Sequence, residues 1–167
     1  MSNDVFIISG TLGAGKSTLS RQINSKLGYA LIDGDALFNP LENTPNLSWD
    51  DRLQITWSNI ANITTEYLKN NLNVVIDFVV ESELAWFLEQ LESYHPKVKY
   101  CQLIADETTL TSRLSARDGS TQYLIRSLKL LSRIKDDSTI RKFLVDTSKM
   151  SERDVFETFL RKDQYFI

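Results

Sequence analysis

A glycine-rich segment near the N-terminus, residues 10–17, carries the spacing G-x-x-x-x-G-K-[ST]. It follows the short apolar run 5–8 and precedes a segment, 19–27, whose leucine and isoleucine residues recur at helical spacing. Glycines let a loop turn its backbone N–H groups toward phosphate oxygens, and the N-terminus of the next helix adds positive potential. This strand–loop–helix context predicts a phosphate-binding loop that holds ATP.

Two side chains of this loop have chemical roles of their own. Lys16 is expected to bridge the β- and γ-phosphates as a catalytic cation, and the Ser17 hydroxyl can ligate Mg²⁺. A glycine-rich turn with an incidental Lys-Ser pair is the alternative, but it leaves unexplained why every fixed position of the pattern is filled. The residues expected to contact the nucleotide here are Gly10, Gly13, Ala14, Gly15, Lys16, Ser17 and Thr18.

A second constellation, Asp33-Gly34-Asp35, follows the apolar segment 29–32. In an open α/β sheet the carboxyl ends of the strands face the ligand crevice, so both carboxylates are expected near the phosphate-binding loop. One acid would organise Mg²⁺ and its water molecules, and the other would accept a proton from an attacking hydroxyl group. The alternative, an acid that only caps a turn, explains one of the two carboxylates but not both.

These motifs lie in a chain whose apolar runs alternate with helical patterns, which is typical of βαβ units and a parallel sheet. Ser48 with Asp51, and Ser151 with Asp154, are placed to cap helices. A length of 167 residues suits one domain. Strands are expected near 4–9, 29–32, 73–79, 98–104 and 143–146, and helices near 16–27, 48–70, 81–93, 107–116, 121–135 and 151–161.

The composition of the chain excludes several classes of binding partner and location. A net charge of −3 argues against general binding of nucleic acid or a membrane surface. The single cysteine, Cys101, builds no disulfide, and no apolar run is long enough for a signal peptide or a membrane span. We therefore expect a cytoplasmic protein, monomeric or homodimeric. Residues 113–142 hold eight basic and three acidic side chains, which indicates either a solvated helix face or arginines placed to hold phosphates.

The motifs together resemble those of the P-loop small-molecule kinases, which include gluconate, adenylylsulfate and shikimate kinases and the chloramphenicol-phosphotransferase-like group. The specific similarity lies in residues 10–18 and 32–35 and, more loosely, in 113–117 and 146–150. The Asp-Gly-Asp turn continues Ala-Leu-Phe-Asn-Pro, without the histidine of gluconate kinases, and Asp77-Phe-Val-Val replaces the glycine-rich motif of shikimate kinase. The sequence is most similar to members of the group without an assigned substrate.

This resemblance implies a fold and an activity. The fold would be the three-layer αβα architecture of P-loop NTPases, with a five-stranded parallel sheet in the order 2-3-1-4-5. Residues 1–167 would form one domain, similar to nucleoside monophosphate kinases, with a lid near 115–123. The activity would be transfer of the ATP γ-phosphoryl group to a hydroxyl of a small molecule, such as a sugar acid, an antibiotic or a similar metabolite.

The resemblance also implies roles for residues on the acceptor side. Asp33 would hold the water shell of Mg²⁺, and Asp35 would contact the acceptor hydroxyl and act as its base. Arg52 would bind a polar or anionic acceptor, unless it is a surface arginine paired with Asp50 or Asp51. Asp77, loosely similar to a Walker B aspartate, would lie near Mg²⁺ or substrate.

On the nucleotide side, the resemblance implies that Arg113 stacks on adenine and that Arg117 reaches the transferred phosphoryl group. Their spacing also allows a plain surface pair on one helix face. Arg126 is a third candidate for contact with phosphate. The segment Thr147, Ser148 and Lys149 would close the other side of the adenine pocket.

Two other functions stay open. A nucleoside or nucleotide kinase would need aromatic side chains to stack on the acceptor base, and Phe38, Trp49 or Phe78 could supply them. An ATP-binding switch module that acts on a protein partner would leave the Asp33 and Asp35 pair unexplained.

Overall fold

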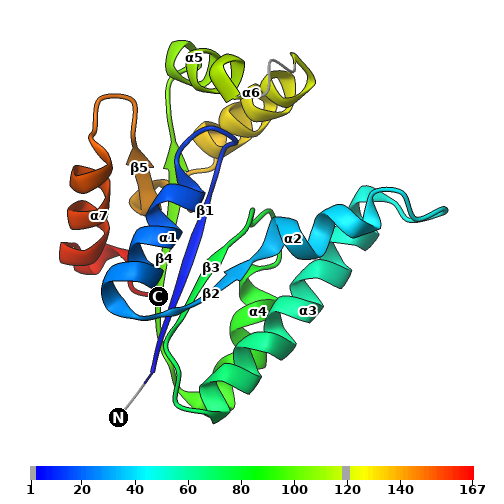
Figure 1. The fold of residues 1–167 in the computed structure, drawn as a ribbon, viewed down its shortest axis with the longest axis vertical. Helices are drawn as coiled ribbons and strands as arrows, with labels where there is room; N and C mark the ends of the chain where they lie inside the picture. Colours follow the sequence, from blue (N-terminus) through cyan, green and yellow to red (C-terminus); the bar gives the residue numbers. More distant parts are fainter. Residues whose placement is uncertain (1–2, 118–120) are drawn as a thin grey trace.

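One sheet organises the molecule. In the computed structural model, which describes residues 3–117 and 121–167, five parallel strands lie in the order β2-β3-β1-β4-β5 (Figure 1). The strands are β1 (Asp4–Gly10), β2 (Ala30–Asp33), β3 (Val74–Asp77), β4 (Lys97–Ile104) and β5 (Leu144–Asp146). The predicted parallel sheet and its strand order are confirmed.

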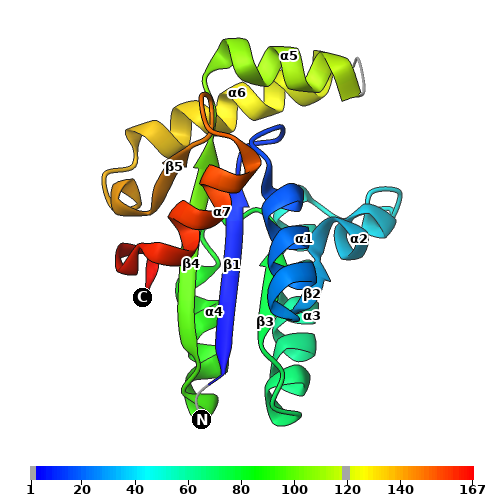
Figure 2. The ribbon, with the colours of Figure 1, turned by 60° about the vertical axis from the view of Figure 1, so that its left-hand side comes forward.

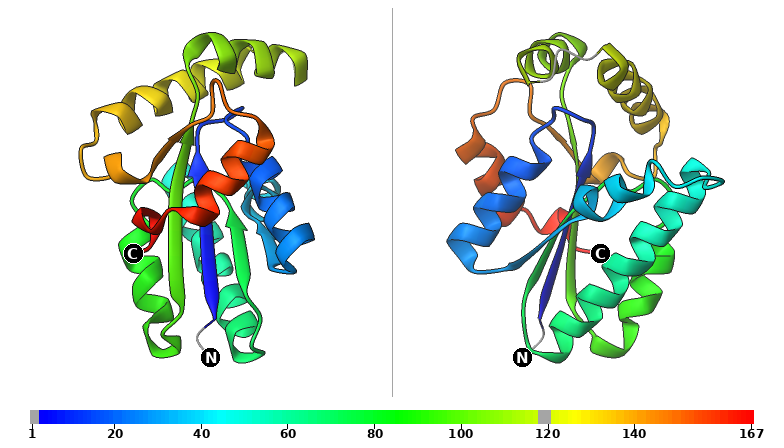
Figure 3. Two further views of the ribbon diagram at one scale, coloured as in Figure 1. Left: turned by 90° about the vertical axis from the view of Figure 1, so that its left-hand side faces the viewer. Right: turned by 45° about the vertical axis from the view of Figure 1, so that its right-hand side comes forward.

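Helices cover both faces of the sheet and its carboxyl edge. On one face lie α1 and α7, on the other α3 and α4, while α5 and α6 cross beyond the carboxyl ends of the strands (Figure 2, Figure 3). This arrangement confirms the predicted αβα layers. The helices are α1 (Lys16–Leu27), α2 (Gly34–Phe38), α3 (Trp49–Lys69), α4 (Leu84–Leu91), α5 (Glu107–Arg117), α6 (Thr121–Asp136) and α7 (Glu152–Arg161). Short 3-10 turns follow at Asn39–Leu41, Glu92–Tyr94, Arg141–Phe143 and Asp163–Tyr165.

Two helices begin with the capping boxes that the sequence predicts. Ser48 accepts a hydrogen bond from the backbone N–H of Asp51, whose carboxylate accepts one from the N–H of Ser48. Ser151 and Asp154 form the same reciprocal pair at the start of α7. Each pair satisfies N–H groups that a helix end leaves without partners, so the start of each helix is determined by local sequence.

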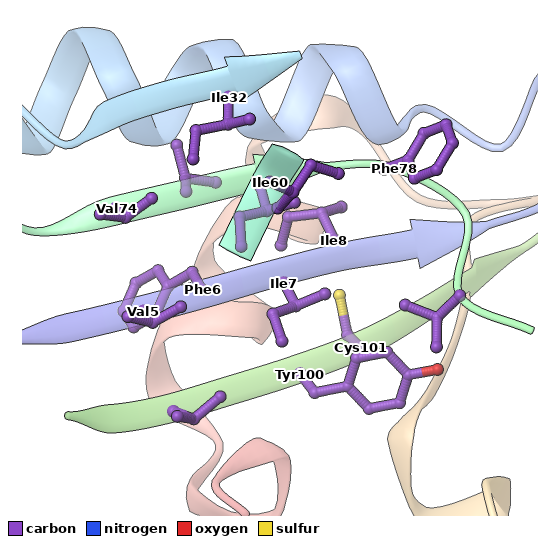
Figure 4. Packing of buried hydrophobic residues seen from close by; sticks show 14 of the residues in the cluster. Val5, Phe6, Ile7, Ile8, Ile32, Ile60, Val74, Phe78, Tyr100 and Cys101 are labelled. Atoms are coloured by element: carbon purple, nitrogen blue, oxygen red, sulfur yellow. The ribbon is translucent and has the colours of Figure 1, made fainter. Parts of the chain in front are cut away.

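The core lies between the sheet and its helices. Ile7, Ile8 and Cys101 are fully buried in the two central strands, where Figure 4 shows them side by side. From α3, Trp57 is fully buried and donates its Nε1–H to the Val79 carbonyl oxygen at 3.2 Å. A strand that is covered on both faces is apolar almost throughout, which explains the near-continuous apolar runs of the sequence.

Two local predictions are wrong. The third strand ends at Asp77 rather than residue 79, because segment 78–80 leaves the ladder and takes other partners: the N–H of Val80 donates to Ser9 Oγ at 2.9 Å. The next helix runs over Leu84–Leu91 rather than 81–93. The short helix α2 was not expected at all. An apolar run shows that a segment is buried but not that it pairs as a strand.

None of the helices in the described part of the chain is both long and apolar enough to cross a membrane. The predicted lid at 115–123 falls partly outside the described residues, since α5 ends at Arg117 and α6 begins at Thr121.

Candidate active site

The phosphate-binding loop connects β1 to α1 at the carboxyl edge of the sheet. Gly10 has a φ of 134°, and a Cβ on this residue would lie 2.0 Å from the carbonyl oxygen of Leu103. Glycine is therefore required for β1 to turn into the loop so close to β4. Gly15 is the N-cap of α1 and makes no side-chain capping bond, so the first N–H groups of the helix face the loop without a capping side chain.

Three consecutive carbonyl groups of the loop are held by side chains from distant parts of the chain. The bonds run from Ser127 to Leu12 (2.8 Å), from Arg113 to Gly13 (3.2 Å) and from Thr147 to Ala14 (3.0 Å). In a trans peptide the C=O and N–H groups point in opposite directions. Holding the carbonyl groups from outside therefore favours a loop that presents N–H groups to an anion.

Arg113 is half-buried between the loop and the segment after β5. Besides its bond to Gly13, it donates from Nη1 to Thr147 Oγ1 at 3.0 Å and from Nη2 to the Thr147 carbonyl oxygen at 3.1 Å. These bonds use the edge of the guanidinium group, whereas stacking on a base uses its face. Arg113 therefore is not the exposed member of a surface pair, while the side chain of Arg117 lies outside the described part of the structure.

These residues border a cavity of about 390 Å³, here called the loop cavity. One wall is the loop itself, from Leu12 to Leu19, and the opposite wall is formed by Arg113 and by side chains after β5. Besides the phosphate-binding loop, the cavity is lined by Thr147, Met150, Glu152 and Val155. This arrangement suits a nucleotide whose phosphates lie on the loop.

The two acids of the Asp-Gly-Asp turn lie where β2 passes into α2. Asp33 caps the helix, since its carboxylate accepts the N–H of Ala36 at 3.3 Å. A Cβ on Gly34 would lie 2.3 Å from the ring of Phe78, so the turn reaches the end of β3 only because this residue is glycine. Asp35 is exposed and borders the loop cavity, as expected for an acid that meets a substrate.

Asp77 ends β3 beneath the phosphate-binding loop and is buried. Burial raises the pKa of its carboxyl group, and the charges of Asp35 and Asp33 add to this rise, although Lys16 and a hydrogen bond from Ser17 oppose it. A buried carboxylate that faces the lysine and serine of the loop has the position of a metal-side acid.

Ser17 and Asp77 together fit Mg²⁺. The ion prefers oxygen ligands and is usually held by one or two protein oxygens plus substrate phosphates. The Ser17 hydroxyl acts on the Asp77 carboxylate and lowers its pKa, so the two oxygens lie near each other beside the loop and give such a pair. Within residues 3–117 and 121–167, no group of three acidic, histidine or cysteine side chains could hold a metal ion by itself.

A second cavity, of about 410 Å³, adjoins the loop cavity and shares Lys16 and Asp35 with it. We call it the aromatic cavity, because Phe38, Trp49 and Phe78 line it. The rings pack together: Phe38 lies 4.8 Å from Trp49 and 5.9 Å from Phe78, measured between ring centroids. Its far wall is α6, which contributes the basic side chains Arg126, Lys129 and Arg133.

The predicted site residues fall into three groups. The loop cavity gathers Gly13, Ala14, Gly15, Lys16, Ser17, Thr18, Asp35, Arg113 and Thr147, and the aromatic cavity gathers Gly10, Lys16, Asp35 and Phe38. Asp33, Arg52, Asp77, Ser148 and Lys149 border neither cavity. Arg52 instead donates its Nε–H to the Ser48 carbonyl oxygen at 3.3 Å.

Sequence reasoning missed Glu81, and it counted Lys129 and Arg133 only within the basic segment 113–142; all three line the aromatic cavity. A signal for Glu81 was present, because it is the first charged residue after the apolar end of the third strand, at the edge where ligands bind. Arg133 follows Arg126 by seven residues, a spacing that returns to the same helix face.

Comparisons with known proteins agree with this geometry. The chain is 26% identical over 144 residues to the thermoresistant gluconokinase of Escherichia coli (strain K12), covering 81% of this chain and 80% of that protein. A sugar kinase from Janibacter sp. HTCC2649 has a similar fold, with a TM-score of 0.67, 16% identity and coverage of 98% and 97% of the two chains. The APS kinase of Mycobacterium tuberculosis, solved with AMPPNP and APS, gives a TM-score of 0.65 at 14% identity over 95% and 96% of the chains.

The fold and the resemblance to P-loop kinases predicted from the motifs are thus confirmed. Residues 5–136, which include the phosphate-binding loop and both acids of the turn and end with the last residue of α6, match a family described as AAA domain. Because this match spans most of the chain, the protein belongs to the AAA domain family.

Proposed function

We propose that the protein transfers the γ-phosphoryl group of ATP to a hydroxyl group of a small molecule. The observation that carries this proposal is that Lys16 and Asp35 border both cavities. A cation that can bind phosphate and an acid that can accept a hydroxyl proton therefore lie where the loop cavity meets the aromatic cavity. The named kinases among the relatives support the same reaction class.

In this reaction the acceptor hydroxyl oxygen forms a bond to the γ-phosphorus while the bond to the β–γ bridging oxygen breaks. Asp35 takes the hydroxyl proton, and ADP leaves with the bridging oxygen. Lys16 neutralises charge that develops on the phosphate oxygens, and the N-terminus of α1 adds to its effect. Arg117, which lies within the predicted lid region, is proposed to hold the transferred group.

Mg²⁺, when bound, would supply positive charge between the β- and γ-phosphates. Ser17 would ligate it directly. Asp77, whose pKa Ser17 lowers, and Asp33, at the adjacent end of β2, would orient its water molecules. The reduced, buried thiol of Cys101 suits the cytoplasm, which we propose as the location of the protein.

A nucleoside or nucleotide kinase is a second candidate, because three aromatic side chains line the cavity assigned to the acceptor. Such rings can stack on a nucleobase. The two candidates share the nucleotide site and differ only in the acceptor.

The test is a screen for phosphorylated product with Mg-ATP and a panel of sugars, sugar acids, hydroxy acids and nucleosides, followed by Asp35→Asn. We expect the variant to bind Mg-ATP normally and to lose phosphoryl transfer by roughly two or more orders of magnitude. Asp136→Asn, at the exposed end of α6, is the matched control and should keep both properties. Transfer that survives Asp35→Asn would exclude this acid as the base. A panel without any phosphorylated product would favour the ATP-binding switch instead.

A further inference from the structure

One carboxylate, that of Glu81, connects the two walls of the aromatic cavity. Glu81 follows β3 on the aromatic wall and accepts a hydrogen bond there from Trp49 Nε1 at 3.4 Å. Its other carboxylate oxygen accepts a bond from Arg133 Nη1 of α6, on the opposite wall, at 2.8 Å. The guanidinium carbon of Arg126, also on α6, lies 4.3 Å from the centroid of the Trp49 ring. Four side chains thus form a circuit that leaves α6 at Arg126 and returns to it at Arg133.

The two walls belong to different clusters of buried apolar residues. Phe38 and Phe78, on the aromatic wall, belong to the main core. The helix α6 instead buries Leu131 and Ile134 in a smaller cluster, together with Leu110 of α5 and residues at the end of β4. The wall that α6 forms is therefore not packed into the main core. Contacts across the cavity help to determine how far this wall lies from the aromatic side chains.

The backbone from which Glu81 extends is held by side chains on both sides of it. The Val80 N–H donates to Ser9 Oγ at 2.9 Å, and the Val80 carbonyl oxygen accepts from Gln102 Nε2 at 3.5 Å. The N–H of Glu81 itself donates to the Glu83 carboxylate at 2.9 Å. Ser9 and Gln102 are buried in β1 and β4, so the sheet fixes the segment that carries Glu81.

The contacts that span the cavity are individually weak. The side chain of Glu81 is 19% exposed and that of Arg133 is 67% exposed, and an ion pair or a cation–π contact with an exposed partner contributes little by itself. Glu81 makes one of these contacts directly. It also orients the Trp49 ring on which Arg126 lies. Its loss should therefore weaken both contacts, whereas the loss of either arginine breaks only one.

We propose that Glu81 is a positioning residue for phosphoryl transfer, because it sets the distance between α6 and the aromatic wall. An acceptor beside Asp35 would be enclosed by these two walls, so their separation decides how closely its hydroxyl group is held to the phosphoryl group. This inference rests on the proposed kinase function. It gives Glu81 no part in proton transfer, and it does not depend on the chemical class of the acceptor.

The separation of the walls can be measured without an acceptor. Ser132→Cys on α6 and Asn59→Cys on α3, at exposed positions outside both cavities, carry spin labels, while the buried thiol of Cys101 stays unlabelled. Double electron–electron resonance then gives the distribution of distances between the labels, with Mg²⁺ and a non-hydrolysable ATP analogue present. We expect Glu81→Gln to broaden this distribution and shift it to longer distances, because a single carboxamide oxygen cannot replace both carboxylate oxygens.

Two variants of Arg133 assign the effect to the ion pair. Arg133→Gln should change the distribution in the same direction as Glu81→Gln. Arg133→Lys keeps a cation opposite Glu81 and should restore most of the original distribution. Glu66→Gln is the matched control, because it breaks an exposed ion pair with Lys69 on α3, outside both cavities, and should leave the distribution unchanged. Circular dichroism checks that each variant is folded.

The same variants should separate KM from kcat for any acceptor that the screen identifies. We expect KM for the acceptor to rise by about threefold in Arg133→Gln and by more in Glu81→Gln, with a smaller change in kcat. Affinity for the ATP analogue should stay unchanged, because Ser127 of α6 still holds the Leu12 carbonyl group of the phosphate-binding loop.

An unchanged distance distribution in Glu81→Gln would overturn the inference. An unchanged KM in a variant whose walls have separated would overturn it as well. Failure of the kinase proposal is distinguishable from these results. If the walls separate as expected but no hydroxyl compound is ever phosphorylated, Glu81 still sets the shape of the cavity and the kinase proposal falls. If a compound is phosphorylated and the distances do not respond, the kinase holds and the role given to Glu81 is wrong.

Discussion

Asp33 and Asp77 are direct Cα partners at the carboxyl ends of β2 and β3, yet Asp33 is exposed and Asp77 is only 7% exposed. Their surroundings differ as well, because Lys16 and Ser17 of the loop act on the Asp77 carboxyl group while Asp33 caps α2. Two neighbouring acids of the same type thus have different environments, and we expect them to have different roles.

The burial of Asp77 predicts that replacing it should increase stability and lower activity. Burial raises the pKa of Asp77 in the folded protein above its usual value, so between these two pKa values the folded state binds more protons than the unfolded state. The stabilisation that this carboxyl group gives to the folded state is fully present below its unfolded pKa. It is lost as the pH rises through its folded pKa. Asp77→Asn should therefore raise the melting temperature of the nucleotide-free protein at neutral pH, and should lower Mg²⁺-dependent turnover.

Scanning calorimetry at pH 4 and pH 7, with turnover measured against Mg²⁺ concentration, checks this prediction. The gain in stability should be larger at pH 7 than at pH 4. Glu89→Gln is the control, because it removes an exposed acid from α4 and should give no such gain. A destabilised Asp77→Asn variant at neutral pH would show that the charged carboxylate is satisfied in the folded state.

The position of Lys16 predicts that replacing it should impair ATP binding and turnover without preventing folding. Its ammonium donates to the Thr11 carbonyl oxygen at 3.2 Å within the loop, a bond whose net worth is about 1 kcal/mol. Lys16→Ala should therefore fold, as judged by circular dichroism. Affinity for ATP should fall by about tenfold or more and turnover should be nearly lost, because a fixed cation beside the β- and γ-phosphates is removed. Unchanged ATP affinity by calorimetric titration would contradict the nucleotide site itself.

Features that depend on residues close together in the sequence could be predicted, whereas contacts between distant segments could not. The phosphate-binding loop, the capping boxes and the Asp33 turn depend on neighbouring residues, and their positions could be predicted. The strand order came from the resemblance, since alternating strands and helices indicate a parallel sheet without ordering its strands. Contacts between distant segments were out of reach: Glu81 and Arg133 are 52 residues apart, and no local pattern joins them.

The short helix α2 shows a further limit. Its five residues are too few for a helical period to be recognised, and it is stabilised by the Asp33 cap and by packing of Phe38 on Trp49 and Phe78. Segment 78–80 was taken for strand because it is apolar. The Phe78 N–H still bonds the Ile8 carbonyl oxygen, but the Val80 N–H and the Val79 carbonyl oxygen bond Ser9 and Trp57, which are side chains that no strand pattern predicts.

The close contact at Gly34 predicts that the Asp-Gly-Asp turn and the end of β3 cannot move independently of each other. Gly34→Ala places a methyl group 2.3 Å from the Phe78 ring, so the turn or the ring must shift. We expect a loss of about 1–3 kcal/mol in unfolding free energy and a lower turnover, because Asp35 moves with the turn. Gly28→Ala is the control: its φ of 73° is strained, yet nothing lies within 4 Å of the new methyl group.

The double variant Gly34→Ala/Phe78→Leu tests the cause of the defect in Gly34→Ala. It distinguishes a clash with the Phe78 ring from a wider distortion of the turn at residues 33–35. Replacing the ring by a smaller side chain gives the methyl group room, so part of the lost turnover should return. Without any recovery relative to Gly34→Ala alone, the ring contact would not be the cause of the defect. Unfolding in urea and steady-state kinetics supply both measurements.

Arg113 gives the last prediction, which concerns the nucleotide site. Its guanidinium group bonds Gly13 and both the hydroxyl and the carbonyl oxygen of Thr147, so it ties the phosphate-binding loop to the segment after β5. Arg113→Lys keeps the positive charge, but a single ammonium lacks the planar fork and cannot span these acceptors. We expect ATP affinity to fall by about tenfold, since the loop loses a fixed carbonyl and, if Arg113 stacks on adenine, the base loses a flat partner.

Thr147→Val separates these two causes. It removes the hydroxyl that accepts from Arg113 and donates to Ala14, while it leaves the guanidinium face in place. Affinities for ATP and for inorganic triphosphate, which has no base, are then compared in both variants. If Arg113 stacks on adenine, Arg113→Lys should weaken ATP more than triphosphate, whereas Thr147→Val should weaken both equally. Equal losses in both variants would limit Arg113 to positioning the loop, and native ATP affinity in Arg113→Lys would remove it from the nucleotide site.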